Sequence, residues 1–288
     1  MKKGDIEPLF KQWIEENRLE EKAESTLKSY KKKIDRFIQW LPAEEEITKG
    51  TIIAYKEYMQ TILSKATTNN NIIALNMFLK YIGLEDFRVK QIKIQKAFSN
   101  EENLTLEDLD RLKRFAKKEN DMQDFYIMEI LTTTGIRIEE LKYFTVENLK
   151  SSYIKVFNKG KDRKIVLTGD LHRSLKRYAR ENHIKTGYLF PSKQVAGKMI
   201  NKSTIWRHLQ NLAGKAKVKK NKVHAHNFRH LFAIQCKNNN ISDLDIADMM
   251  GHNSLETTRR YTRSSLADKK KQLESISYRP NGKAHKSK

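Results

Sequence analysis

A short stretch in the C-terminal half of the chain combines side chains that can act together on a phosphate ester. It reads His226-Asn227-Phe228-Arg229-His230, and Gly251-His252 and Tyr261 follow it. A phenol is a weak nucleophile at neutral pH because its pKa is about 10. It can attack phosphorus where neighbouring groups take its proton and cations hold the phosphate oxygens. A lone tyrosine usually serves packing, so the prediction of phosphoryl chemistry rests on the whole set.

A second guanidinium, Arg137, lies far upstream within the segment 134–141, just after Gly135. Its flat fork of donors matches two phosphate oxygens, which makes it a candidate phosphate-binding residue. The alternative is a structural ion pair with Glu140, three residues on. Both can hold, because Glu140 could orient the arginine, or a nearby histidine, while the outer face of the guanidinium meets phosphate.

A basic turn, residues 158–163, adds a further cation between two expected strands. Lys159 lies next to Gly160, and such a turn can lower an ammonium group into a groove. The alternative is a solvated charge, and Lys161 is a rival for the same role.

His226 and Arg229 are three residues apart, so on a helix they share a face. They could present a proton carrier and a guanidinium to one phosphate, whereas His230 points elsewhere and is expected to be structural. The pair His224 and His226 could indicate zinc, but no clustered Cys or acidic ligands accompany it. We therefore predict no metal. A lone histidine at the position of His252 would ordinarily be a cap or a core residue.

The order Arg, Lys, His-x-x-Arg, His, Tyr resembles the tyrosine recombinase (phage integrase) family. The resemblance covers most of the chain and is strongest over residues 134–141, 158–167, 226–232 and 250–261. It implies a mainly α fold with a small β-sheet (α+β), made of a helical-bundle core-binding domain and a tyrosine-recombinase catalytic domain. Departures are slight: Phe228 within the His-x-x-Arg box and Met250 before Gly251.

The resemblance also implies catalytic roles. Arg137 and Arg229 would bind the non-bridging oxygens of the scissile phosphate. Tyr261 would attack phosphorus and form a 3′-phosphotyrosyl link. Lys159 would protonate the departing 5′-oxygen.

Three further residues would support this chemistry. His226 would act as the general acid and base for the tyrosine, and His252 would hydrogen-bond the phosphate and help to place the nucleophile. Glu140 matches the acidic residue that supports the pocket. The covalent link conserves the bond energy, so rejoining would require no cofactor.

By the same resemblance the chain would be a site-specific DNA recombinase that works through a Holliday junction as a homotetramer on two duplexes. The core-binding pattern begins almost at once, which favours a compact Xer-like or mobile-element integrase without an arm-binding domain. The C-terminal segment, with Leu266, Leu273 and Ile276, is expected to dock on a neighbouring subunit. The target site, the direction of recombination and the need for accessory proteins stay open.

Two alternatives remain. A type IB topoisomerase-like enzyme would use the same side chains to nick and close DNA as a monomer, although the two-domain layout and the C-terminal segment argue against it. A non-catalytic DNA-binding protein would carry an idle set of catalytic residues, and the completeness of the set argues against that.

The charge of the chain favours a polyanionic partner. The net charge is +22, and it is uneven: residues 1–100 carry 18 Lys or Arg against 14 Asp or Glu, whereas residues 101–288 carry 39 against 21. Such a basic region fits nucleic acid, although a generally basic protein would look similar. Cys236 is the only cysteine, which excludes an internal disulfide and agrees with the cytoplasm; it is expected to be a buried small residue. No apolar run is long enough to span a membrane.

The elements that must position these residues follow from the apolar periodicity. Residues 1–87 predict a four-helix core-binding domain, with helix starts at Ser25 or Thr26 and at Thr48, and a helix end at Gly83. Lys31, Lys32 and Lys33 form a basic edge assigned to DNA binding, with a solvated helix face as the alternative. Lys161 and Arg163 of the basic turn are also assigned to DNA binding.

Residues 88–103 lack a clear period and predict a linker. Residues 104–277 predict the catalytic domain, which begins with a helix at Thr105 and contains strands over 153–157 and 164–167. Residues 278–288 predict a basic flexible tail.

Overall fold

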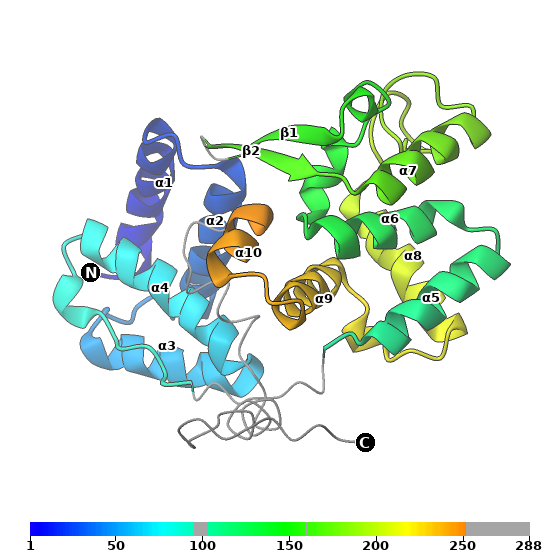
Figure 1. Cartoon of the computed structure of the whole chain (residues 1–288). Helices are drawn as coiled ribbons and strands as arrows, with labels where there is room; N and C mark the ends of the chain where they lie inside the picture. The colour runs from blue at the N-terminus through cyan, green and yellow to red at the C-terminus, as the bar shows by residue number, and fades with distance from the viewer. Residues whose placement is uncertain (95–102, 159–160, 252–288) are drawn as a thin grey trace, which may run out of the picture. The chain divides into compact units, whose positions relative to one another are not determined.

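The computed structural model describes residues 1–94, 103–158 and 161–251. The chain divides into two compact units, an N-terminal unit, Met1–Ala97, and a C-terminal unit, Phe98–Lys288. Figure 1 shows the chain as mostly helical with one two-stranded sheet, as the sequence predicted. None of the helices described is long and apolar enough to cross a membrane.

The N-terminal unit is a bundle of four helices, as predicted. They are α1 (Lys3–Leu19), α2 (Glu24–Trp40), α3 (Lys49–Ile62) and α4 (Lys65–Tyr81), and a 3-10 turn, η1 (Glu85–Phe87), follows. Helix α4 packs against each of the other three. The core is aromatic: the Trp13 ring lies 5.4 Å from that of Phe78, and the Phe37 ring lies 5.0 Å from that of Tyr55.

Local capping explains two of the helix starts. The Thr48 side chain accepts a hydrogen bond from the backbone N–H of Thr51, which confirms the predicted start of α3. The prediction for α2 was wrong, because the helix begins at Glu24 after Ala23, which makes no side-chain cap. Ser25 and Thr26 therefore lie inside the first turn of α2.

Residues 88–94, at the start of the expected linker, are held against the N-terminal unit by two asparagines of α4. Asn76 exchanges a pair of hydrogen bonds with the backbone of Val89 (2.8 and 3.1 Å), and Asn69 does the same with Ile92 (2.9 and 2.8 Å). Seven residues of helix rise about 10.5 Å, and three residues of extended chain span about 10 Å. The two spacings match, so the side-chain amides pair with the extended segment much as a strand would.

The C-terminal unit is a second, larger assembly. Its helices are α5 (Leu106–Lys118), α6 (Met122–Thr134), α7 (Gly169–Glu181), α8 (Lys202–Lys215), α9 (Ala225–Asn238) and α10 (Asp243–Met250), with 3-10 turns η2 (Ile138–Tyr143), η3 (Asn148–Lys150) and η4 (Lys220–Lys222). The predicted start of α5 is confirmed, because Thr105 and Asp108 form a capping box.

The sheet pairs β1 (Tyr153–Asn158) with β2 (Lys161–Val166) antiparallel, with Tyr153 opposite Val166 and Asn158 opposite Lys161. The second strand thus starts three residues earlier than predicted.

Helix α6 forms the centre of the C-terminal unit, with α5, α7, α8 and α9 around it (Figure 1). Its residues are buried on several faces, among them Ile127, Ile130 and Leu131. A helix that is apolar nearly all round requires such neighbours. Cys236 of α9 is buried as predicted, and burial raises the pKa of its thiol to about 11.

Candidate active site

The C-terminal end of α6 brings the first candidate residue beside α9. Gly135 ends the helix in the left-handed region, with φ of +60°. A side chain there would overlap the ring of Phe232 on α9. Glycine therefore serves both the backbone conformation and the close approach of the two helices. Arg137 follows two residues after this glycine.

Arg137 is anchored by Glu140 and by the end of α10. The Glu140 carboxylate accepts a hydrogen bond from the backbone N–H of Arg137 at 2.7 Å and lies 3.7 Å from its Nη1. The ion pair foreseen as an alternative is therefore present. The guanidinium Nη2 donates to the carbonyl oxygen of Gly251 at 2.9 Å, and Nη1 donates to that of Met250 at 3.4 Å. The side chain keeps 41% of its surface exposed, so the guanidinium is accessible from solvent.

Arg229 lies deeper, with 3% of its surface exposed. Its Nη1 donates to the carbonyl oxygen of Gly135, and its Nη2 donates to that of Met250 at 2.6 Å. Because Arg137 also donates to Met250, the two predicted phosphate-binding arginines meet at one carbonyl group. The structure thus brings together guanidinium groups that are 92 residues apart in the sequence.

His226 lies one turn before Arg229 on α9, as the spacing predicted. Its pKa is lowered, first by the loss of solvent around the ring and then by the charges of His224, Arg229 and Arg137. His226 and Arg229 are three residues apart on α9, so the imidazole lies on the same face of the helix as that guanidinium. A lowered pKa favours the neutral ring, which is the form that accepts a proton.

His224 stacks on His226, with ring centroids 6.5 Å apart and an interplanar angle of 9°. Loss of solvent also lowers the pKa of His224. In the ranges that the structure describes, no group of three or more His, Cys, Asp or Glu side chains could hold a metal ion.

Arg163 joins the sheet to the same place. Its Nη2 lies 2.6 Å from Oε2 of Glu140, and its Nη1 donates to the carbonyl oxygen of Met249 at 2.5 Å. Three arginines therefore donate to the last three carbonyl groups of α10 and its cap, at Met249, Met250 and Gly251. Cations are favourable there because the C-terminal end of a helix carries partial negative charge and unpaired carbonyl groups.

The sequence interpretation did not foresee these contacts of Arg163, although strand alternation could have indicated them. Residues two apart in a strand share a face. Arg163 therefore lies on the same face of β2 as Ile165, which is buried.

Three predicted catalytic residues, Lys159, His252 and Tyr261, lie outside the described residues. The flanking elements do reach two of them. Strand β1 ends at Asn158, directly before Lys159, and β2 begins at Lys161. The cap of α10, Gly251, directly precedes His252 in the sequence. The expected docking segment, with Leu266, Leu273 and Ile276, and the expected tail also lie outside the described residues.

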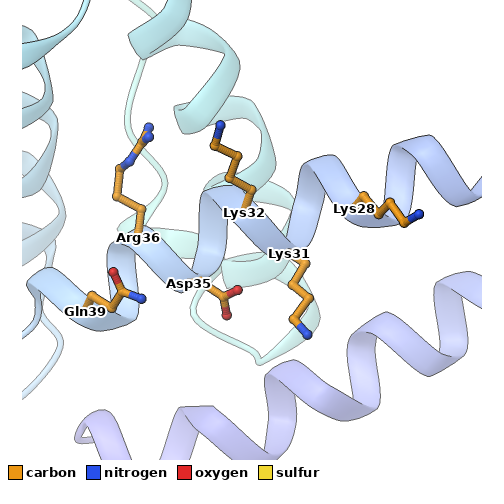
Figure 2. A pocket seen from close by; sticks show the side chains of 6 residues that line it. All are labelled: Lys28, Lys31, Lys32, Asp35, Arg36 and Gln39. Carbon is orange, nitrogen blue, oxygen red and sulfur yellow. The ribbon is translucent and has the colours of Figure 1, made fainter. Parts of the chain in front are cut away.

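A separate basic surface lies on α2 in the N-terminal unit (Figure 2). Its hollow is lined by Lys28, Lys31, Lys32, Asp35, Arg36 and Gln39. Lys32 and Arg36 are one turn apart and point to the same side of the helix, whereas Lys31 points to the other side. Lys33 does not line the hollow; it is half-buried, and loss of solvent lowers its pKa.

The sequence matches known families along most of its length. Residues 102–267 match the sequence model described as the Phage integrase family, and residues 9–86 match that of the phage integrase N-terminal SAM-like domain. Tyrosine recombinase XerA of Pyrococcus furiosus is 28% identical over 267 residues, which are 89% of each chain. Tyrosine recombinase XerD of Haemophilus ducreyi is 26% identical over 287 residues, covering 89% of this chain and 93% of its own.

Solved structures agree on the fold. A Tn1549 transposon integrase in complex with transposon right end DNA aligns with a TM-score of 0.74 at 16% identity, covering 96% of this chain and 99% of that one. A crystal structure of XerA recombinase aligns with a TM-score of 0.53 at 25% identity, covering 95% and 98%.

Proposed function

The chain belongs to the phage integrase family, the tyrosine recombinases, and from this premise we propose that it is a site-specific DNA recombinase. The observation that carries the proposal is the convergence of Arg137 and Arg229 at the end of α10, with His226 one turn before Arg229 on α9. Arg137 directly precedes η2, and Arg229 and His226 lie on α9. Two guanidinium groups can hold the oxygens of a phosphate while the imidazole carries a proton.

Phosphate binding is assigned to the two arginines. Arg137 is accessible and can turn its remaining donors to the non-bridging oxygens of a phosphodiester. Arg229 is 3% exposed, and its carbonyl partners hold the guanidinium in one orientation. Cations that are already in place before the charge develops need no reorganisation during the reaction.

Proton transfer is assigned to His226 and Lys159. The lowered pKa of His226 keeps its imidazole neutral near pH 7, so it can take the proton of the Tyr261 phenol. The phenolate attacks phosphorus, the tyrosine becomes linked to the 3′-phosphate, and the 5′-oxygen leaves with a proton from Lys159. His252 would help to hold the phosphate. Reversal of these steps on a new 5′-hydroxyl rejoins the strand.

The proposed partner is double-stranded DNA that carries a recombination site. The uneven charge of the chain and the basic hollow on α2 support it. Lys31, Lys32 and Lys161 are proposed backbone contacts, and Arg36 joins them from its position in Figure 2. Two relatives were solved on DNA: XerH site-specific recombinase with a difH substrate, and the Tn1549 integrase with transposon DNA.

We propose that the protein assembles on DNA as its family does. Four copies would act on two duplexes through a Holliday junction, with the C-terminal segment of each docking on a neighbour. Action in the cytoplasm is part of the same proposal.

The covalent step is the sharpest test. A nicked suicide substrate traps the protein–DNA adduct, which is resolved on a denaturing gel. Wild-type protein should form the adduct, and Tyr261→Phe should bind the same DNA without forming it. Tyr153→Phe, at an exposed tyrosine of β1, is the matched control and should behave as wild type. An adduct with the Tyr261→Phe variant would remove Tyr261 from the reaction.

A second measurement separates recombination from simple nicking and closing. Products that join strands of two differently labelled duplexes are expected from a recombinase. Relaxation of supercoiled DNA without such joined products would favour the topoisomerase alternative.

A further inference from the structure

Arg163 has the contacts of a residue that holds other groups in place. It extends from β2, one strand of the hairpin that contains Lys159, and its guanidinium reaches the carboxylate of Glu140 and the carbonyl oxygen of Met249. Only 14% of its side chain is exposed. The two terminal nitrogens thus each have a protein acceptor, one on η2 and one on α10.

Gly251 makes room for this arrangement. A Cβ atom on Gly251 would lie 2.9 Å from Cδ of Arg163 and 3.0 Å from its Nε. The glycine also has φ of +62°, which side chains rarely adopt. Arg163 therefore passes directly over the residue that precedes His252.

The surroundings of Arg163 differ from those of a DNA-backbone contact. A surface arginine that meets the DNA backbone needs donors open to solvent, whereas both terminal nitrogens of Arg163 meet acceptors within the protein. Burial lowers the pKa of Arg163, the charge of Glu140 opposes that change, and Arg137 adds to it. The two terminal nitrogens of the guanidinium thus bind acceptors within the protein. These contacts argue against our sequence-based assignment of Arg163 to DNA binding.

We propose that Arg163 is a positioning residue, which ties the Lys159 hairpin and Glu140 to the end of α10 and so places both edges of the catalytic pocket. The proposal rests on the proposed recombinase function. Because the hairpin and the end of α10 flank Lys159 and His252, loosening this connection should misplace the groups around the phosphate. It should leave contacts with the DNA backbone in place.

The test compares Arg163→Lys with wild type and with Lys164→Ala, a variant of the exposed neighbour on the other face of β2. Lysine keeps the positive charge but lacks the planar fork that reaches two acceptors at once. Three quantities are measured: the dissociation constant for DNA at several salt concentrations, the single-turnover rate of adduct formation at saturating DNA, and the melting temperature.

For Arg163→Lys we expect the rate of adduct formation to fall about tenfold to a hundredfold, since small misplacements of reacting groups cost this much. Affinity and its salt slope should stay as in wild type. Loss of a phosphate contact would instead weaken binding and reduce the salt slope by about 1. An unchanged cleavage rate, or a defect confined to binding, would overturn the proposal.

Gly251→Ala gives an independent approach, because it disturbs Arg163 from the opposite side without removing its charge. If both variants act through one contact, the double variant Gly251→Ala/Arg163→Lys should be little slower than the slower single variant. Multiplication of the two defects would count against the shared contact. Wild-type protein that forms no adduct would defeat the proposed function itself, whereas active wild type with active Arg163→Lys would defeat only this inference.

Discussion

Arg137 and Arg229 are assigned to the same phosphate, yet their contacts predict unequal costs when either is replaced by alanine. Arg229 is 3% exposed and donates to the carbonyl oxygens of Gly135 and Met250. Arg229→Ala would leave the Gly135 carbonyl in a protected place without this donor, whereas the Met250 carbonyl would keep its longer hydrogen bond from Arg137. One unsatisfied buried group costs about 1–3 kcal/mol, and this is the loss of stability that we expect.

Arg137→Ala should cost much less. Its side chain is 41% exposed, and Met250, one of its two carbonyl partners, keeps the hydrogen bond from Arg229. Water can replace the lost donor at the exposed site, so a loss below about 1 kcal/mol is expected. For a domain of about 150–250 residues, each kcal/mol moves the melting temperature by about 2–4 °C. Arg229→Ala should therefore melt about 2–12 °C lower, and Arg137→Ala less than about 4 °C lower.

Differential scanning calorimetry of the two variants beside wild type measures this difference. Adduct formation must then be compared well below both melting temperatures, where each variant should be slower by orders of magnitude. Arg229→Lys is the control, because it keeps the charge and can retain one of the two carbonyl contacts; its melting temperature should be intermediate. Equal melting temperatures for the two alanine variants would refute the argument from burial.

Three further outcomes are expected. Burial raises the pKa of Asp124 to about 8, and the neighbouring Asp121 adds to the effect. Because this pKa lies above the unfolded value of about 3.9, the folded protein keeps a proton that the unfolded protein loses. The stability of the protein therefore falls as the pH rises towards 8. The stability advantage of Asp124→Asn over wild type should thus grow by about 1.4 kcal/mol per pH unit between pH 5 and 7, and a pH-independent difference in denaturant titrations would contradict this. Gly135→Ala should lower the melting temperature by several degrees, because its side chain would overlap Phe232; an unchanged value in thermal unfolding would show that α9 yields easily. Lys32→Ala should weaken DNA binding and reduce its salt slope by about 1 in titrations at several ionic strengths without changing adduct formation at saturating DNA, and an unchanged slope would remove Lys32 from the interface.

Much of the secondary structure could be predicted because its signals are local. Thr48 and Thr105 cap helices through atoms three residues away, and Gly135 and Gly251 end helices through their own backbone conformation. The start of α2 could not be predicted in this way, since its N-cap is Ala23, which makes no side-chain cap.

The sequence predicted which residues belong to the candidate site better than it predicted the contacts between them. The pairing of His226 with Arg229 follows from helical spacing. The contacts between Arg137 and Gly251 join residues 114 positions apart, and no periodicity reports such a distance. The inward position of Arg163 needed the register of β2 and the place of α10 together, and the sequence alone supplies only the alternation of the strand.

The two asparagines of α4 decide where the N-terminal unit stops. A proteolytic fragment cut after Phe87 would leave the amide groups of Asn69 and Asn76 without the backbone groups that they now bind, and Asn69 is buried. A fragment that continues to Ile94 would keep both pairs. We therefore expect the longer fragment to be the more stable of the two, because side chains of α4 bind the chain several residues beyond the last helical turn.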